Sequence, residues 1–194
     1  MISDKDKKQF MAGKTHWLER SSDVEFLLLA IDSEFDNING LNILDAGCAQ
    51  GRDTSEIFNS GMRVTGIDSN EKFISEARHN HPDIQFNVGN IEDLPYDDEQ
   101  FDVVYCVNTL FYTRPEESLP ELERVLKSGG IVFITLDKSI FDMDKNKELH
   151  SMDVDRALLN FKNCKIISKV YTERVDKTPL NHKHFFYKII LRKN

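Results

Sequence analysis

The sequence predicts an α/β fold in which helices cover both faces of a mostly parallel, seven-stranded sheet that ends in an antiparallel strand pair. Short apolar runs rich in Val, Ile and Phe alternate with helical patterns over most of the chain. This alternation is typical of doubly wound parallel sheets. Two later β-rich runs are separated only by a polar, proline-containing segment, which favours antiparallel pairing.

Seven apolar runs are the predicted strands. Five of them are expected to be parallel: residues 42–46, 63–67, 84–88, 101–107 and 131–136. The antiparallel pair is expected at residues 165–171 and 184–191. The polar segment 137–151 is expected to be a long connection, and connections of this length in compact domains are often functional.

Helical patterns fill the gaps between these runs. Residues 22–25 have the spacing of a capping box, apolar positions follow on one helical face, and Gly40 stands where this helix would end. Later helices are expected over residues 53–59, 70–78, 118–127 and 154–161. In the helix 118–127, Pro120 is expected in the first turn and Gly129 just past the end.

Charge and hydropathy limit the partners that this chain can have. Lys and Arg number 25 against 33 Asp and Glu, giving a net charge of -8, whereas a grip on nucleic-acid phosphates needs clustered positive charge. No apolar run approaches the length that crosses a bilayer, and residues 1–8 are charged where a signal peptide is apolar. We expect a cytoplasmic protein that binds neither nucleic acid nor membranes. The sequence indicates no particular oligomeric state.

A glycine-punctuated turn follows the first predicted strand. Gly47 and Gly51 lie in this turn, and Asp68 closes the second strand. Because the carboxyl ends of parallel strands meet at one edge of a sheet, these residues are expected to line one crevice. Glycine lets the backbone approach a ligand closely, and a carboxylate can accept hydrogen bonds from both ribose hydroxyls. The pattern therefore predicts a nucleoside-binding site.

Four segments follow one another in order within residues 42–136: residues 45–51 (D-A-G-C-A-Q-G), residues 66–69 (G-I-D-S) with the acid Asp68, residues 88–96 (V-G-N-I-E-D-L-P-Y) and residues 125–130 (V-L-K-S-G-G). They resemble, in the same order, motifs of the small-molecule type of class I S-adenosylmethionine-dependent methyltransferases. The first, third and fourth of these family motifs are D-x-G-x-G-x-G, V-G-D-A-E-D-L-P-F and V-L-K-P-G-G. Ala49 replaces the middle glycine of the first motif, and Asn90 replaces the usual aspartate of the third. The resemblance implies a Rossmann-like fold and S-adenosylmethionine as the cofactor.

The resemblance also implies which residues contact this cofactor. Gly47 and its neighbours would approach the methionine part, Asp68 would hold the ribose hydroxyls, and Asn90 and Ile91 would contact adenine. The full expected set is Asp45, Gly47, Cys48, Ala49, Gly51, Asp68, Ser69, Asn90, Ile91, Cys106 and Val107.

The chain length fits a single methyltransferase domain, because 194 residues are too few for two ordinary domains. We expect residues 1–21 to form an N-terminal arm or lid, residues 22–136 the cofactor-binding core, and residues 137–194 a C-terminal part with the closing strands. The acceptor is expected to be a small molecule. Residues 106–109 lack both the Asn/Asp-Pro-Pro-aromatic signature of base-amine methyltransferases and the Pro-Cys nucleophile of cytosine-ring enzymes.

The expected reaction is an in-line methyl transfer. The sulfonium already makes the methyl group electrophilic, so the protein would act mainly by orientation and desolvation. An oxygen acceptor needs a base unless it arrives ionised, and His16 and Tyr112 are the candidates. Phe111 and Tyr112 stand where many family members have a His-His pair, which indicates a more aromatic acceptor wall.

No metal site is expected. The spacing of His79 with His81 and of His182 with His184 could suit a metal ion, but both pairs lie in polar contexts with no third ligand evident. Solvated surface histidines are therefore the favoured interpretation. The odd number of cysteines, without paired spacing, likewise indicates neither disulfides nor zinc.

Two other functions stay open at the level of sequence. One is a module that binds S-adenosylmethionine or its product without transferring methyl groups, which the departures at Ala49 and Asn90 support. The other is a dinucleotide-dependent oxidoreductase, whose G-x-G-x-x-G loop places a pyrophosphate at a helix N-terminus. Here the glycine spacing differs, and Asp53 stands where the phosphate would lie.

Overall fold

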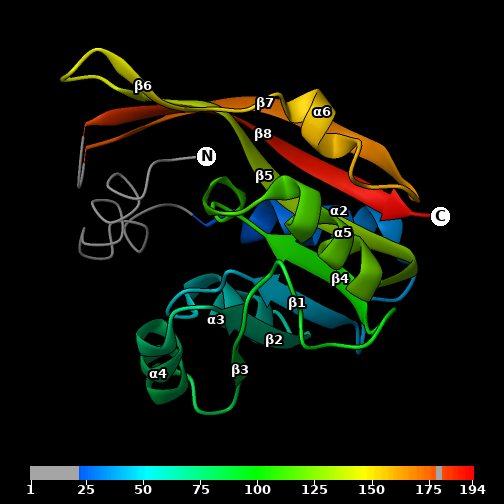
Figure 1. The fold of residues 1–194 in the computed structure, drawn as a ribbon. Helices are drawn as coiled ribbons and strands as arrows, with labels where there is room; N and C mark the ends of the chain where they lie inside the picture. Colours follow the sequence, from blue (N-terminus) through cyan, green and yellow to red (C-terminus); the bar gives the residue numbers. More distant parts are fainter. Residues whose placement is uncertain (1–21, 178–180) are drawn as a thin grey trace.

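The computed structural model describes residues 22–177 and 181–194. One sheet dominates these parts (Figure 1), and its strands are β1 (Asn42–Ala46), β2 (Arg63–Asp68), β3 (Gln85–Val88), β4 (Phe101–Cys106), β5 (Leu126–Asp142), β6 (Lys147–Ser151), β7 (Cys164–Asp176) and β8 (His182–Lys193). The strand order is β3-β2-β1-β4-β5-β8-β7, and β6 pairs with β5 off this path. The predicted mostly parallel sheet with closing antiparallel strands is confirmed, and β6 is an unpredicted eighth strand.

Helices cover both faces of the sheet, as predicted. They are α2 (Val24–Glu34), α3 (Arg52–Asn59), α4 (Glu71–Asn80), α5 (Pro115–Val125) and α6 (Val154–Leu158), with a short 3-10 helix η2 (Leu110–Tyr112) after β4. Alternate residues of a strand lie in two separate hydrophobic cores, one on each face of the sheet. Ile43 belongs to the core with α2, α3 and α4, whereas Leu44 belongs to the core with α5 and α6. This alternation follows from the two-residue period of a strand.

The ends of α2 differ from the prediction. Asp23, not Ser22, is the N-cap, and Ser22 Oγ instead accepts the backbone N–H of the first helical residue at 2.9 Å. The Asp23 carboxylate does not cap the helix but pairs with Lys188 of β8. The helix ends at Glu34, well before Gly40, so the predicted capping box and stop signal are wrong.

The start and end of α5 are also corrected. The helix begins at Pro115, one turn before the predicted start, so that Pro115 occupies the first turn and Pro120 lies inside the helix. A proline at the first position is tolerated because its missing N–H would have no partner there. Gly129 does not end this helix but lies within β5 with a φ of 77°.

The predicted connection 137–151 is instead mostly strand. β5 continues to Asp142 and pairs with β8 from Ile131 opposite Arg192 to Asp142 opposite His182, with a shift of register between Asp137 and Ser139. β6 pairs antiparallel with the same end of β5. We call this part the antiparallel extension: residues 137–142 of β5, β6, residues 174–176 of β7 and residues 182–186 of β8. It lies at the upper left of Figure 1, beyond the parallel strands.

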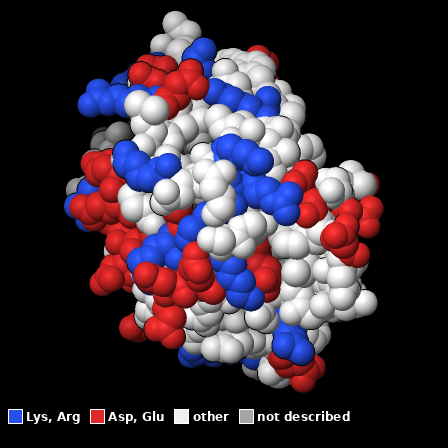
Figure 2. All heavy atoms as spheres, turned by 90° about the vertical axis from the view of Figure 1, so that its right-hand side faces the viewer, with Lys and Arg blue, Asp and Glu red and all other residues white. Residues whose placement is uncertain are grey.

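Acidic and basic side chains are interspersed on the face shown in Figure 2. Arg124 illustrates the local pairing of charges, since its guanidinium contacts Glu121 at 2.7 Å and Asp98 at 2.9 Å. Within the ranges 22–177 and 181–194, no helix has both the length and the apolar character that crossing a membrane requires.

Candidate functional site

A cavity of about 530 Å³ lies where β1, β2, β3 and β4 end and their loops begin. Most of the predicted cofactor residues line it: Asp45, Gly47, Cys48, Ala49, Asp68, Ser69, Asn90, Ile91 and Val107. Gly51 and Cys106 do not. Gly51 packs against Phe86, and Cys106 is fully buried in the core on the α5 side of the sheet. The topology thus brings four loops to one rim.

The turn after β1 needs glycine at Gly47. Its φ is 89°, and a Cβ there would overlap the Thr109 side chain, lying 2.8 Å from Thr109 Cβ. The N–H groups of Gly47 and Cys48 both donate to the carbonyl of Ile67, at 2.8 and 3.0 Å. Ala49 also has a positive φ, 48°, so the residue that replaces the family's middle glycine adopts a backbone conformation that glycine favours.

Asp68 is held rigidly beside this turn. One carboxylate oxygen accepts the Ala49 N–H at 3.0 Å, and the other accepts the Asn70 N–H at 2.9 Å. Burial raises the pKa of Asp68, and these two hydrogen bonds partly offset the rise. Each oxygen has a further lone pair, so the carboxylate can still accept a pair of neighbouring hydroxyls.

Asn90 and Ile91 form the wall contributed by the loop after β3. Asn90 Oδ1 accepts the backbone N–H of Glu92 at 3.0 Å, which fixes the side chain and leaves one lone pair of this oxygen for a ligand amine. The Glu92 carboxylate in turn binds the backbone N–H and the guanidinium of Arg114, at 2.7 and 2.9 Å. Ile91 adds an apolar surface that is 5% exposed.

The floor of the cavity is acidic. Complete burial, with the nearby Asp53 carboxylate as the second cause, raises the pKa of Asp45 to about 8. Thr54 donates its hydroxyl to Asp45 at 2.6 Å. Asp53 accepts hydrogen bonds from Arg52 Nε at 2.6 Å and from the Tyr105 hydroxyl at 2.8 Å. The Asp53 carboxylate at this position favours a cationic ligand over a pyrophosphate.

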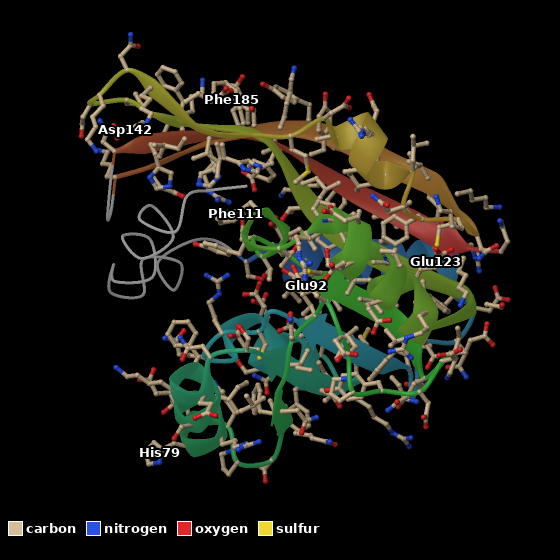
Figure 3. All side chains as sticks on the ribbon, in the orientation of Figure 1. His79, Glu92, Phe111, Glu123, Asp142 and Phe185 are labelled. Atoms are coloured by element: carbon tan, nitrogen blue, oxygen red, sulfur yellow. The ribbon has the colours of Figure 1, made fainter. Side chains whose placement is uncertain are left out.

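The other end of the cavity is walled by the loop after β4 and by the antiparallel extension. Thr109, Phe111 and Tyr112 line this end, and Phe111 packs on Ile140 of β5. Figure 3 shows Phe111 beneath the extension, whose far end carries Asp142. Tyr112, a predicted base, therefore borders the cavity. His16, the other predicted base, lies outside the described residues.

His184 also lines this end of the cavity and was not predicted there. Its side chain is 1% exposed and that of His182 is 0% exposed, so the expectation of solvated histidines is wrong for this pair. The reason is topological: β8 lies between β5 and β7 and is not an edge strand. The sequence did carry one signal for this burial: the two histidines lie two residues apart on a β-rich run, so they are on the same face of the strand.

Residues 44–134 match a protein family described as a methyltransferase domain. The chain is 34% identical over 95 residues to an uncharacterized methyltransferase from Synechocystis sp., covering 47% of this chain and 45% of that protein. It is 31% identical over 125 residues to phthiotriol/phenolphthiotriol dimycocerosates methyltransferase 1 from Mycobacterium ulcerans, covering 62% and 44%. The chain thus spans less than half the length of these curated relatives.

The fold has close counterparts among solved structures. A crystal structure of a SAM-dependent methyltransferase from Methanosarcina mazei superposes with a TM-score of 0.70, covering 84% of this chain and 96% of that one. The sequence identity is 20%, so this likeness is evidence of the fold alone.

Proposed function

We propose that the chain is a class I S-adenosylmethionine-dependent methyltransferase and that it transfers the methyl group of this cofactor to a small-molecule acceptor, and the match of residues 44–134 to a methyltransferase domain supports this proposal. One observation carries the proposal. The close main-chain turn at Gly47, the fixed carboxylate of Asp68 and the Asn90 loop line the same cavity. These are the groups that a sulfonium nucleoside requires: room at the backbone, an acceptor for ribose hydroxyls and a wall for adenine.

The proposed placement of the cofactor follows from these groups. Its ribose hydroxyls donate to Asp68, its adenine lies against Ile91 with its amine near Asn90, and its methionine part lies along the turn at Gly47. The ammonium and sulfonium charges then face the Asp53 carboxylate, which also lines the cavity. A pyridine dinucleotide would bring its pyrophosphate to the same carboxylate, which would repel it.

The proposed reaction is a displacement in line with the carbon–sulfur bond. A lone pair of the acceptor forms a bond to the methyl carbon while the electrons of the carbon–sulfur bond pass to sulfur, releasing S-adenosylhomocysteine. The chain contributes orientation and exclusion of water. Phe111, which is 6% exposed, and Tyr112 supply an aromatic wall for the acceptor, and the Tyr112 hydroxyl and His16 are the proposed proton acceptors for an oxygen nucleophile.

The test is formation of S-adenosylhomocysteine by the full chain with a panel of alcohols, phenols, carboxylic acids and amines. We expect turnover with at least one class, and its loss in Asp68→Ala. The matched control is Glu71→Ala, which removes an exposed carboxylate from the first turn of α4 and should leave turnover unchanged. Tight cofactor binding with no product from any acceptor would favour the non-catalytic binding module instead.

A further inference from the structure

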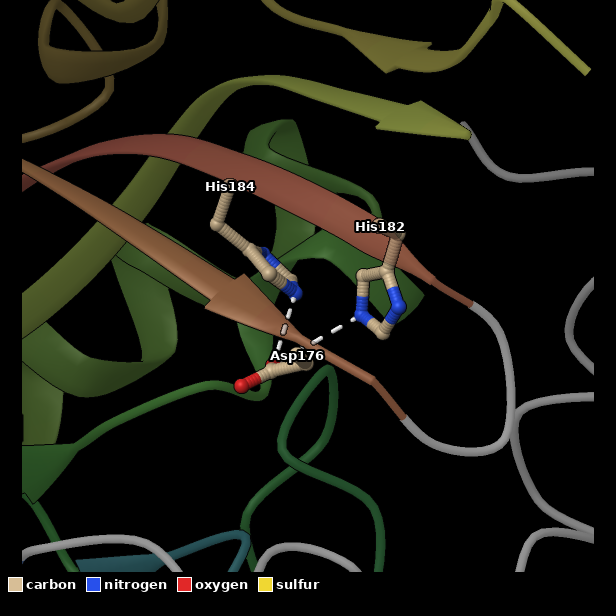
Figure 4. Close-up of side chains that lie close together, drawn as sticks. All are labelled: Asp176, His182 and His184. Carbon is tan, nitrogen blue, oxygen red and sulfur yellow. Dashed lines mark ion pairs between the residues drawn. The ribbon is translucent and has the colours of Figure 1, made fainter. Parts of the chain in front are cut away.

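A cluster of buried ionisable side chains lies in the antiparallel extension. Asp176 at the end of β7 pairs in register with His182 at the start of β8, and His184 follows two residues later on the same face of the strand. Figure 4 shows the three side chains converging. The carboxyl group of Asp176 is 9% exposed, and the two imidazoles are almost completely buried.

The spacing of the cluster suits a metal ion. Asp176 Oδ2 lies 3.6 Å from His182 Nε2 and 3.4 Å from His184 Nε2, and one ligand atom from each residue lies within 4.8 Å of the others. Tetrahedral zinc, with bonds of about 2.0–2.1 Å to nitrogen and oxygen, separates its ligand atoms by about 3.4 Å. The observed distances therefore leave room for one such ion between the three side chains.

Asp137 orients the His184 ring for this role. Its Oδ1 lies 2.7 Å from His184 Nδ1, and both side chains are buried. When Nδ1 carries the proton donated to Asp137, the lone pair on Nε2 faces Asp176. Among the described residues, His184 Nε2 has no hydrogen-bond partner. A carboxylate behind a histidine in this way is the usual arrangement around protein-bound zinc.

The charges around the cluster also favour a cation. Asp137 and Asp176 contribute two negative charges, and Arg174, whose Nε donates to Asp176 Oδ2 at 3.2 Å, contributes one positive charge. Two carboxylates beside imidazole nitrogens attract a cation, and a metal ion can accept lone pairs from both kinds of group.

We propose that Asp176, His182 and His184 bind a divalent transition-metal ion, with zinc the best fit to the donor set. Imidazole nitrogens suit zinc, iron, nickel and copper, whereas magnesium prefers oxygen ligands throughout. Three protein ligands leave a fourth position for an exogenous ligand, as in catalytic zinc sites. Because His184 also lines the cavity, the ion would border the acceptor end. That consequence rests on the proposed function, but metal binding itself does not.

The experiment is a calorimetric titration of the chelator-treated full chain with zinc chloride, and with magnesium chloride as the comparison. We expect one zinc ion per chain and no saturable heat from magnesium. His182→Gln should weaken zinc binding by more than about 100-fold, and Asp137→Asn, which removes the orienting carboxylate, by about 10- to 100-fold. These titrations need neither cofactor nor acceptor. A failure of the methyl-transfer proposal would therefore leave the metal-binding proposal intact.

The matched control is Lys183→Ala, between the two histidines. Lys183 pairs with Glu173 at 2.6 Å and lies over the Phe185 ring, so this variant should bind zinc as the wild type does. If His182→Gln does not fold, the visible spectrum of the cobalt-loaded wild type tests the site instead. Tetrahedral cobalt absorbs visible light much more strongly than octahedral cobalt, and we expect the tetrahedral spectrum. A folded wild type that takes up no zinc, a folded His182→Gln that binds it unchanged, or an octahedral cobalt spectrum would each overturn the proposal.

Discussion

The parallel part of the sheet and the antiparallel extension contribute to the cavity in different ways. In the parallel part, the main chain shapes the site: Gly47 makes room, and Asp68 is fixed by two backbone N–H groups. In the extension, a pair of side chains does so: His184, which lines the cavity, is held by Asp137 of the neighbouring strand β5. Under the proposed function, cofactor recognition therefore depends on backbone geometry, whereas the proposed acceptor end depends on side chains that can be exchanged without altering a turn.

Removing the Asp68 carboxylate should have the largest effect on the parallel half. Asp68→Ala deletes the proposed ribose acceptor and frees the N–H groups of Ala49 and Asn70. Two hydrogen bonds to a charged group contribute about 3 kcal/mol, so calorimetry should show about 100-fold weaker binding of S-adenosylmethionine. Asp68→Asn keeps one oxygen acceptor, so its affinity for S-adenosylmethionine should lie between that of the wild type and that of Asp68→Ala. Equal affinity in Asp68→Ala would contradict the ribose assignment.

A methyl group at Gly47 should destabilise the turn more than one at Gly40. Both glycines have positive φ, 89° and 79°, but the added Cβ meets Thr109 at Gly47 and nothing within 4 Å at Gly40. The comparison of Gly47→Ala with Gly40→Ala thus isolates the steric term, which is about 2 kcal/mol for overpacking a close contact. Chemical denaturation of both variants measures it, and equal losses would show that the close approach is unimportant.

Asp45 should make stability fall as pH rises. Its pKa is about 8 in the folded chain against 3.8 ordinarily, so the folded state binds the proton more tightly and is favoured most below about pH 4. Stability then declines until the pH passes about 8. Between pH 6 and pH 7.5 the decline is about 2 kcal/mol. Asp45→Asn keeps an oxygen that accepts the Thr54 hydroxyl and should not show this decline of stability with pH. An identical decline in the variant would show that Asp45 does not cause it.

Restoring glycine at Ala49 should have the smallest effect. Ala49 has a φ of 48°, which costs an L-residue about 1 kcal/mol, but glycine loses more chain entropy on folding. The free energy of unfolding of Ala49→Gly should therefore rise by less than about 1 kcal/mol, with cofactor affinity retained. Denaturant titration against the wild type measures this difference, and a destabilised variant would mean that the alanine methyl packs favourably in the turn.

The parallel half could be predicted because its signals are local. Each strand is one apolar run, and Gly47 and Asp68 sit at strand ends, where the topology brings the loops together. The failures there concern ends of elements: α5 begins at Pro115 because its first turn tolerates a proline without a backbone donor.

The extension could not be predicted because its signals are distant in sequence. Residues 137–142 are polar at several positions that are buried, including Asp137 and Asp142, so they do not resemble a core strand. Asp137 is satisfied by His184, 47 residues away. The third member of the histidine cluster, Asp176, reaches it only through the pairing of β7 with β8.

The most direct test of the proposed cofactor site is a crystal structure of the chain with S-adenosylhomocysteine. The account predicts both ribose hydroxyls within hydrogen-bonding distance of the Asp68 carboxylate and adenine against Ile91. A ribose bound away from Asp68, or a ligand outside the cavity formed at the ends of β1, β2, β3 and β4, would contradict it.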